Sequence, residues 1–248
     1  MNEIIAEFIG TLLLVLLGNG VVANVVLNGT KGNNGGWIVI TLGWGLGVFV
    51  AVAVAGQVSG AHINPAVTIG LAVAGLFDWM RVIPFILAQL LGGMAGASLV
   101  WLFYKDHFNA TDNHGSILAS YATSPAIRRI SGNVISEVIG TFVLVFVILY
   151  IAEPGLELPD NQPARIGLGT LGALPVALLV TAIGLSLGGT TGYAINPARD
   201  LGPRVMHALL PMKFKGTSDW SYAWVPVAGP VIGAVLAASL FLLHQWLF

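Results

Sequence analysis

Long, uninterrupted apolar runs are the main feature of the hydrophobic pattern along this chain. Six of these runs are about 20 residues long, the length at which an α-helix crosses the roughly 30 Å hydrocarbon core of a bilayer. They lie at about 4–27, 37–56, 82–104, 133–152, 167–187 and 222–244. A transmembrane β-barrel would instead show alternating segments of about 10 residues. The pattern therefore predicts an all-α membrane protein with six transmembrane helices.

Two further apolar runs, at about 64–77 and 196–209, are too short to cross a membrane. Asn is favoured at the N-cap of a helix and Pro at the first helical position, so an Asn-Pro-Ala triplet predicts a helix start. Each run begins with such a triplet, Asn64-Pro65-Ala66 or Asn196-Pro197-Ala198. About 13 residues give a helix of about 20 Å, over half of the membrane. Two re-entrant half-helices that enter from opposite faces would meet near the midplane.

The order of the elements indicates an internal repeat. Each half holds three spans and one half-helix, and Ala6–Thr11 resembles Ser136–Thr141 in sequence. Because three is an odd number of spans, the second half must be inserted upside down. We therefore expect one transmembrane domain over 1–248, an inverted 3+3 repeat of about 1–120 and 130–248, with a solute site at the midplane.

Composition excludes several classes of protein. The chain is 56% hydrophobic and only 8% charged, whereas a soluble domain carries about 25% charged residues. We expect membrane lipid around it, and the net charge of −1 offers no basic surface for nucleic acid. The chain has no cysteine, and it shows no metal-ligand spacing, phosphate loop or nucleophile–base set. We expect no enzymatic activity, no cofactor and no metal.

Segments rich in glycine and hydroxyl residues precede both half-helices, at 57–63 and 188–195. Non-helical backbone at membrane depth persists only where it lines water or is buried in protein. Two symmetric segments favour a pore lined by carbonyl oxygens over two tight turns inside a bundle. The expected pore-lining carbonyls belong to Gly60, Ala61, His62, Thr191, Gly192 and Ala194.

The half-helix N-termini favour a solute that is neutral and forms hydrogen bonds. The amide of Asn64 or Asn196 can cap its helix through the oxygen and still offer its NH₂ group to a passing hydroxyl. Each N-terminus also carries about half a positive charge, which repels cations, including hydronium, in a low-dielectric pore.

Arg199 is the most informative single residue. An arginine inside the membrane is energetically costly, so its presence there indicates a function. It lies near the positive end of the second half-helix, where a cation is unfavourable by about 0.3–1 kcal/mol. The alternative is a buried structural ion pair, for which Asp200 is a candidate. Asp200 itself suits the helix dipole and can pair with Arg204 at i+4.

Glu7 and Glu137 occupy matched positions deep in the first and fourth spans. One hypothesis is proton coupling in a transporter. The other is a structural brace, in which each carboxylate accepts N–H groups of a non-helical segment. Two symmetric acids beside two symmetric irregular segments favour the brace.

These residues carry a family resemblance. Ser59–Val67, with its central Asn-Pro-Ala, and Gly192–Asp200 resemble the two signature loops of the aquaporin (major intrinsic protein) family. An Asp directly after Asn-Pro-Ala-Arg is similar to the aquaglyceroporin branch, which includes the bacterial glycerol facilitators, and Arg204, Pro226 and Val227 also fit it. The resemblance implies a homotetramer in the cell membrane with one pore per subunit and cytoplasmic termini.

The same resemblance implies a selectivity filter of four residues: Trp44, Gly184, Tyr193 and Arg199. Trp44 and Tyr193 would form an apolar corner for the carbon edge of a polyol, and Arg199 would bind its hydroxyl edge. Gly184 would leave width where water-selective members usually have His. Taken without the resemblance, Trp44 and Gly184 are equally consistent with helix packing. Tyr193 departs from the Phe of the best-known bacterial glycerol facilitators, and its hydroxyl would narrow or polarise the filter.

The charges in the loops disagree with the implied orientation. The basic-loop rule would place the side with more Lys and Arg in the cytoplasm. That side carries Lys31, Lys105, Arg128, Arg129, Arg204, Lys213 and Lys215, against Arg81 and Arg165 on the other. The family topology puts the more basic side outside, and we prefer it because its pattern is far more specific than a small charge count.

We therefore expect a passive channel for glycerol, other small neutral solutes and water that excludes ions and protons. A water-selective pore is the first alternative, and Gly184 and Asp200 speak against it. A proton-coupled transporter is the second, and it requires a titrating site that faces the solute, which only Glu7 or Glu137 could supply.

Overall fold

The computed structural model describes residues 1–152, 155–157, 163–165 and 167–247. In this part of the chain, six helical segments are long and apolar enough to cross a membrane. They are α1 Glu3–Val26, α2 Gly36–Ser59, α4 Trp79–Phe103, α7 Ile130–Tyr150, the continuous pair η1 Gly169–Ala173 and α8 Leu174–Leu187, and α10 Val225–Leu247. Each overlaps one of the six predicted spans, so the prediction is confirmed.

Two short helices begin at the Asn-Pro-Ala triplets, as predicted. They are α3 Pro65–Val73 and α9 Pro197–Leu209. The prediction that the first runs to residue 77 was wrong, because α3 ends at Val73. Gly75 follows with a φ of 74°, a left-handed conformation that glycine adopts without strain. Asp78 then caps α4, and its side chain accepts a hydrogen bond from the Met80 N–H at 2.9 Å.

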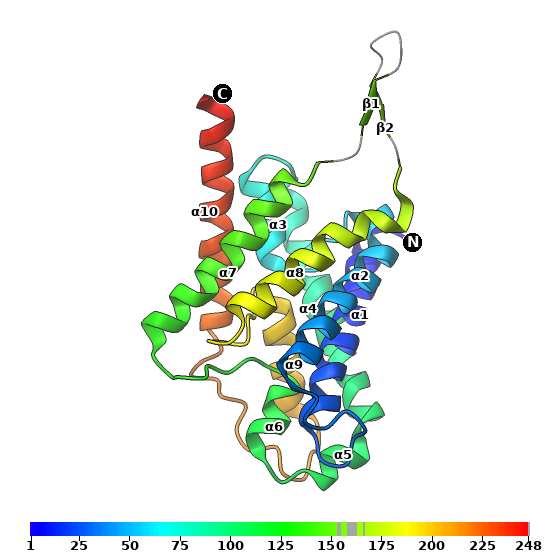
Figure 1. Cartoon of the computed structure of the whole chain (residues 1–248), viewed down its shortest axis with the longest axis vertical. Helices are drawn as coiled ribbons and strands as arrows, with labels where there is room; N and C mark the ends of the chain where they lie inside the picture. The colour runs from blue at the N-terminus through cyan, green and yellow to red at the C-terminus, as the bar shows by residue number, and fades with distance from the viewer. Residues whose placement is uncertain (153–154, 158–162, 166, 248) are drawn as a thin grey trace.

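Short elements occupy two of the connections. The segment between α4 and α7 contains α5 Lys105–Ala110 and α6 His114–Ala119. Strands β1 Gly155–Glu157 and β2 Pro163–Arg165 pair antiparallel, with Leu156 opposite Ala164. This hairpin is an addition to the predicted all-α fold. It lies toward the same end of the molecule as both chain termini, and α5 and α6 lie at the opposite end (Figure 1).

Corresponding helices of the two repeats pack in the same way. A Cβ atom added at Gly92 in α4 would lie 2.3 Å from the carbonyl oxygen of Phe8 in α1. A Cβ atom added at Gly233 in α10 would lie 2.3 Å from the carbonyl oxygen of Val138 in α7. In both pairs the absence of a side chain lets two helix backbones touch, as is common between membrane helices.

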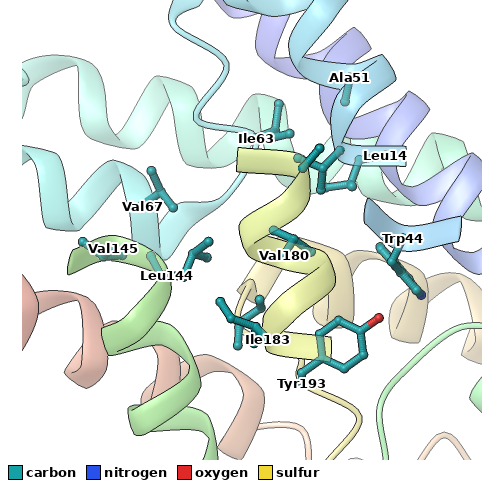
Figure 2. Close-up of a cluster of buried hydrophobic side chains, with 14 of the residues drawn as sticks. Leu14, Trp44, Ala51, Ile63, Val67, Leu144, Val145, Val180, Ile183 and Tyr193 are labelled. Atoms are coloured by element: carbon teal, nitrogen blue, oxygen red, sulfur yellow. The ribbon is translucent and has the colours of Figure 1, made fainter. Parts of the chain in front are cut away.

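Apolar side chains occupy both the core and the outer surface. A buried cluster gathers residues from α1, α2, α7 and α8 around the two non-helical segments, including Leu14, Trp44 and Val180 (Figure 2). Large apolar residues also face outward, such as Leu46, which is 64% exposed, and Phe103, which is 75% exposed. A helix that is apolar on all sides suits a lipid environment, and the chain is a multi-pass membrane protein.

Candidate functional site

The two segments that lead into α3 and α9 have the same unusual backbone. Non-glycine residues with positive φ are uncommon and strained, and they persist where the surroundings hold them. The positive φ angles repeat at matched positions: 82°, 49° and 42° at Gly60, Ala61 and Ile63, and 79°, 38° and 42° at Gly192, Tyr193 and Ile195. The repeat seen in the sequence is therefore also a repeat of backbone conformation.

Asn64 and Asn196 join the two repeats. The side-chain oxygen of Asn64 accepts the N–H of Ala66 at 2.9 Å, and that of Asn196 accepts the N–H of Ala198 at 3.0 Å. Their amide nitrogens point the other way. Asn64 Nδ2 donates to the carbonyl oxygen of Ile195 at 2.8 Å, and Asn196 Nδ2 donates to that of Ile63 at 2.8 Å. Each asparagine caps its own half-helix and also binds the segment before the other.

Pro65, Ala66, Pro197 and Ala198 form the first turns of α3 and α9, and all four are buried. The N–H of the first helical residue has no partner within the helix, and proline has no N–H at all. The asparagine side chain can therefore accept the N–H groups of the residues that follow. These four residues shape the half-helix starts and do not line the cavity described below.

Glu7 lies buried behind the first non-helical segment and accepts hydrogen bonds from it. Its carboxylate accepts the backbone N–H groups of His62 at 2.9 Å and Ile63 at 2.7 Å. It also accepts the Ser59 hydroxyl at 2.6 Å and the Gln89 amide at 2.7 Å. Sequence analysis missed Gln89, because 82 residues separate it from Glu7 and no spacing signal links them.

Glu137 makes the equivalent contacts in the second repeat. Its carboxylate accepts the backbone N–H groups of Ala194 at 3.0 Å and Ile195 at 2.8 Å. These are the contacts that a brace would make. Neither Glu7 nor Glu137 is among the residues that line the cavity.

A cavity of about 130 Å³ lies between the two segments. One part of its wall is aliphatic, with Val48, Val52, Val176 and Val180 among its residues. The rest is polar. Nine of the predicted site residues line the cavity: Trp44, Gly60, Ala61, His62, Asn64, Tyr193, Ala194, Asn196 and Arg199. Gly184, Thr191 and Gly192 are not among the lining residues.

His62 lines the cavity, and its ring is held in a fixed position by neighbours that do not. Its Nδ1 atom lies 3.1 Å from the Thr68 hydroxyl. Its ring contacts Phe77, with 4.5 Å between ring centroids, and Phe85, with 5.1 Å. Aromatic contacts of this kind limit rotation of the imidazole, so the ring keeps one orientation.

Arg199 is buried against the cavity and contacts Trp44. Its guanidinium carbon lies 4.2 Å from the centroid of the indole ring, a cation–π geometry. In the described part of the chain no hydrogen bond from the guanidinium to protein is found. The alternative of an ion pair with Asp200 is not seen either, and the donors of Arg199 stay available at the cavity wall.

Asp200 and Arg204 instead form their own buried pair. Arg204 Nε donates to Asp200 Oδ1 at 2.8 Å, as the i+4 spacing predicted. Asp200 Oδ2 also accepts the backbone N–H and the hydroxyl of Thr123, both at 2.7 Å. Arg204 donates further to the carbonyl oxygen of Ser218 at 2.8 Å. The pair fastens α9 to two connecting segments, and sequence analysis missed Thr123 and Ser218 because they lie far away in the chain.

The Tyr193 ring occupies the space beside Gly184. A Cβ atom added at Gly184 would lie 2.8 Å from Tyr193 Cζ and 2.5 Å from Thr41 Cγ2. This differs from the expectation that Gly184 leaves width to the solute, because the phenol ring takes that width. Figure 2 shows Tyr193 and Trp44 beside α8.

Trp37 holds this arrangement and was also missed by sequence analysis. Its indole Nε1 donates to the Gly184 carbonyl oxygen at 2.9 Å. Its ring meets Tyr193 edge-on, with 5.8 Å between ring centroids. Trp37 lies 147 residues from Gly184, so only the fold brings the two together.

The site has no metal-binding character in the part of the chain that the structure describes, where no group of three His, Cys, Asp or Glu residues could hold a metal ion. The chemistry of the cavity is that of hydrogen-bonding groups and apolar surface.

Comparison with known proteins agrees with this geometry. The family model described as Major intrinsic protein matches residues 1–241. A glycerol uptake facilitator protein of Streptococcus pneumoniae (strain ATCC BAA-255 / R6) is 58% identical over 241 residues, covering 97% of this chain and 98% of the relative. A probable glycerol uptake facilitator protein of Thermotoga maritima is 53% identical over 248 residues, covering 100% of both chains.

A solved structure is similar as well. The X-ray structure of the aquaglyceroporin from Plasmodium falciparum matches with a TM-score of 0.79 and 35% sequence identity, covering 96% of this chain and 94% of that one. Family model, relatives and structure agree over nearly the whole length. The chain belongs to the major intrinsic protein family.

Proposed function

We propose that this protein is a passive channel for glycerol and other small neutral solutes, with water. One observation carries the proposal. The cavity is lined by many aliphatic side chains together with a few polar groups, including Asn64, Asn196 and Arg199. Glycerol has a hydrocarbon edge and a hydroxyl edge, so both kinds of lining group can bind it. Membership of a family of passive channels also means that the protein is not an enzyme.

The proposed roles follow from the contacts. Trp44 and Tyr193 give the filter its aromatic side, and Arg199 donates to the hydroxyl edge. Gly184 contributes to the filter by making room for Tyr193. Asn64 and Asn196 each keep one amide N–H for the solute, since the other donates to the opposite repeat.

The backbone carbonyl groups of Gly60, Ala61, His62 and Ala194 supply acceptors along the cavity, and those of Thr191 and Gly192 extend this row. Glu7 and Glu137 brace the two segments that carry these groups. The N-termini of α3 and α9 repel cations and hydronium at the midplane.

Proton coupling has less support than passive passage. A coupling carboxylate must face the solute, whereas both Glu7 and Glu137 are buried behind the cavity wall and engaged with backbone N–H groups. The names of the relatives, glycerol uptake facilitator proteins, support glycerol over a water-selective pore.

Location and assembly belong to the same proposal. We place the protein in the cell membrane with both termini in the cytoplasm, as a homotetramer in which each subunit has its own pore. The loop that contains α5 and α6 is then external.

Stopped-flow light scattering on proteoliposomes tests the function. We expect rapid, non-saturating glycerol entry that needs no ion gradient and is lost in Gly184→His, where a new side chain must displace Tyr193. Fast water flux without glycerol flux would reject glycerol as the solute. Uptake that requires a proton gradient and disappears in Glu7→Gln would reject the channel itself.

A further inference from the structure

Four tryptophans outside the proposed filter lie at the ends of two helices. They are Trp79 and Trp101 near the two ends of α4, and Trp224 and Trp246 near the two ends of α10. Trp79 is 57% exposed, Trp224 50% and Trp246 81%. The rings of these residues are therefore available to whatever surrounds the two helices.

The same distance separates the two tryptophans of each helix. Trp79 and Trp101 are 22 residues apart, and so are Trp224 and Trp246. In an α-helix this spacing corresponds to about 33 Å, slightly more than the roughly 30 Å hydrocarbon core of a bilayer. Tryptophan is enriched at the level of the lipid headgroups on both sides of a membrane. Each pair is thus spaced to reach both headgroup regions at once.

The inverted repeat does not account for this spacing. Gly92 in α4 and Gly233 in α10 are equivalent points, at which each helix touches its partner. Counted from that glycine, the tryptophan nearer the chain termini is 13 residues away in both helices, and the other tryptophan is 9 residues away in both. Repeat equivalents of the α4 tryptophans would instead fall at Trp220, which precedes α10, and at Leu242. The four tryptophans follow the two sides of the membrane and not the repeat.

Apolar side chains face outward between the tryptophans. On α4, Ile83 is 63% exposed, and Leu87 and Leu91 are each 55% exposed. On α10, Ile232 is 47% exposed and Leu236 is 50% exposed. Residues four apart share a helix face. Between its tryptophans α10 has no Asp, Glu, Lys or Arg, and α4 has one, two residues from the first tryptophan. Each helix therefore presents an apolar strip that ends in aromatic rings.

The end of α4 next to α5 also carries a charge that complements lipid phosphate. The ammonium of Lys105, an exposed residue, lies 5.4 Å from the centroid of the Trp101 ring. In the connecting segments on this side of the molecule, six Lys and Arg residues outnumber three Asp residues. A ring at the headgroup level with a cation beside it suits a phospholipid surface.

We propose that α4 and α10 are lipid-facing surfaces whose four end tryptophans fix the depth of the protein in a phospholipid bilayer. Acyl chains cover the two apolar strips, and headgroups meet the tryptophans at two levels about 33 Å apart. The bilayer that fits has a hydrocarbon core of about 30 Å. This surface is separate from the cavity, so the inference does not depend on which solute passes through the channel.

Fluorescence quenching by brominated lipid measures the depth of each tryptophan. The protein is reconstituted into phosphatidylcholine vesicles brominated either near the carbonyl end or near the methyl end of the acyl chains. Trp79, Trp101, Trp224 and Trp246 are replaced by Phe one at a time, and the fluorescence lost in each variant reports that residue. The ratio of shallow to deep quenching should exceed one at all four. Trp44, which is 3% exposed, is the control, and neither lipid should quench it.

The other outcomes overturn the inference. Stronger quenching by the deep bromines would show that the tryptophans do not mark the headgroup levels. Quenching as weak as that of Trp44 would show that protein, such as a second copy of this chain, covers the two strips. A ratio above one on a single helix would show that the two helices do not share their depth.

A second measurement needs no substitution. The thermal unfolding midpoint of the unmodified protein is followed in phosphatidylcholine bilayers whose acyl chains lengthen in steps. Hydrophobic mismatch costs free energy in bilayers that are too thin or too thick. The midpoint should therefore pass through a maximum where the hydrocarbon core is about 30 Å. A midpoint that does not change with chain length, or that rises steadily to the thickest bilayer, overturns the inference even if a variant fails to insert.

Discussion

At the scale of single residues, glycines decide where the two aromatic residues of the proposed filter lie. Gly184 receives the phenol of Tyr193, and Gly18 in α1 receives the indole of Trp44. A Cβ atom added at Gly18 would lie 2.3 Å from Trp44 Cε3. Such a distance is far inside van der Waals contact, so any other residue at Gly18 moves the tryptophan.

Gly18→Ala should therefore reduce glycerol permeability at least several-fold, because Trp44 must shift toward Arg199 and into the path. The matched control is Gly20→Ala, in the same helix, where an added Cβ atom meets nothing within 4 Å. Alanine is a better helix former than glycine by about 1 kcal/mol, so the control should insert normally. Stopped-flow glycerol entry measures both, and equal permeability in the two variants would contradict the assignment.

At the scale of elements, the repeat appears as equal packing of α1 against α4 and of α7 against α10. At Gly92 and at Gly233, an added Cβ atom would lie 2.3 Å from a backbone carbonyl oxygen of the partner helix. A backbone atom cannot move aside as the end of a flexible side chain can. A side chain at either glycine must therefore push the two helices apart.

Gly92→Ala and Gly233→Ala should each lower the thermal unfolding midpoint in detergent by several degrees, at a cost of about 1–3 kcal/mol for overpacking. Because the two sites are equivalent, the losses should be similar. Gly20→Ala again serves as the control. A loss at one site alone would show that the two repeats do not share their packing energetics.

At the scale of the whole molecule, the segment that links the two repeats meets the segment before α10. Arg128, before α7, forms an ion pair with Asp219, before α10. Burial raises the pKa of Asp219, but the hydrogen bonds from Arg128 and Ser221 lower it, and the pKa lies below its ordinary value of 3.8. The carboxylate is therefore stabilised by folding.

This lowered pKa has a defined consequence for pH dependence. A group with a depressed pKa contributes stability above its unfolded pKa and loses it as the pH falls through the folded value. The difference in unfolding midpoint between the unmodified protein and Asp219→Asn should be constant above about pH 5 and shrink below pH 4. Thermal unfolding across this range measures it. A difference that grows as the pH falls would contradict the ion pair.

The sequence by itself determined the six spans, the two half-helix starts and the inverted repeat. These depend on local quantities: apolar length against bilayer thickness, the cap that Asn and Pro form, and matched residues in two halves. The positions of Glu7 and Glu137 likewise suggested a brace before any contact was seen. What sequence could not show was which donors reach them.

Only the tertiary structure decided the contacts across the chain. It joined Asn64 to Ile195 and Asn196 to Ile63, brought Gln89 to Glu7, and placed the Tyr193 phenol over Gly184. In the three hydrogen-bonded pairs the partners are more than 80 residues apart, so no spacing along the chain encodes the contact. The filter residues are proposed from sequence resemblance, but the space between them is set by how rings and glycines from separate elements pack.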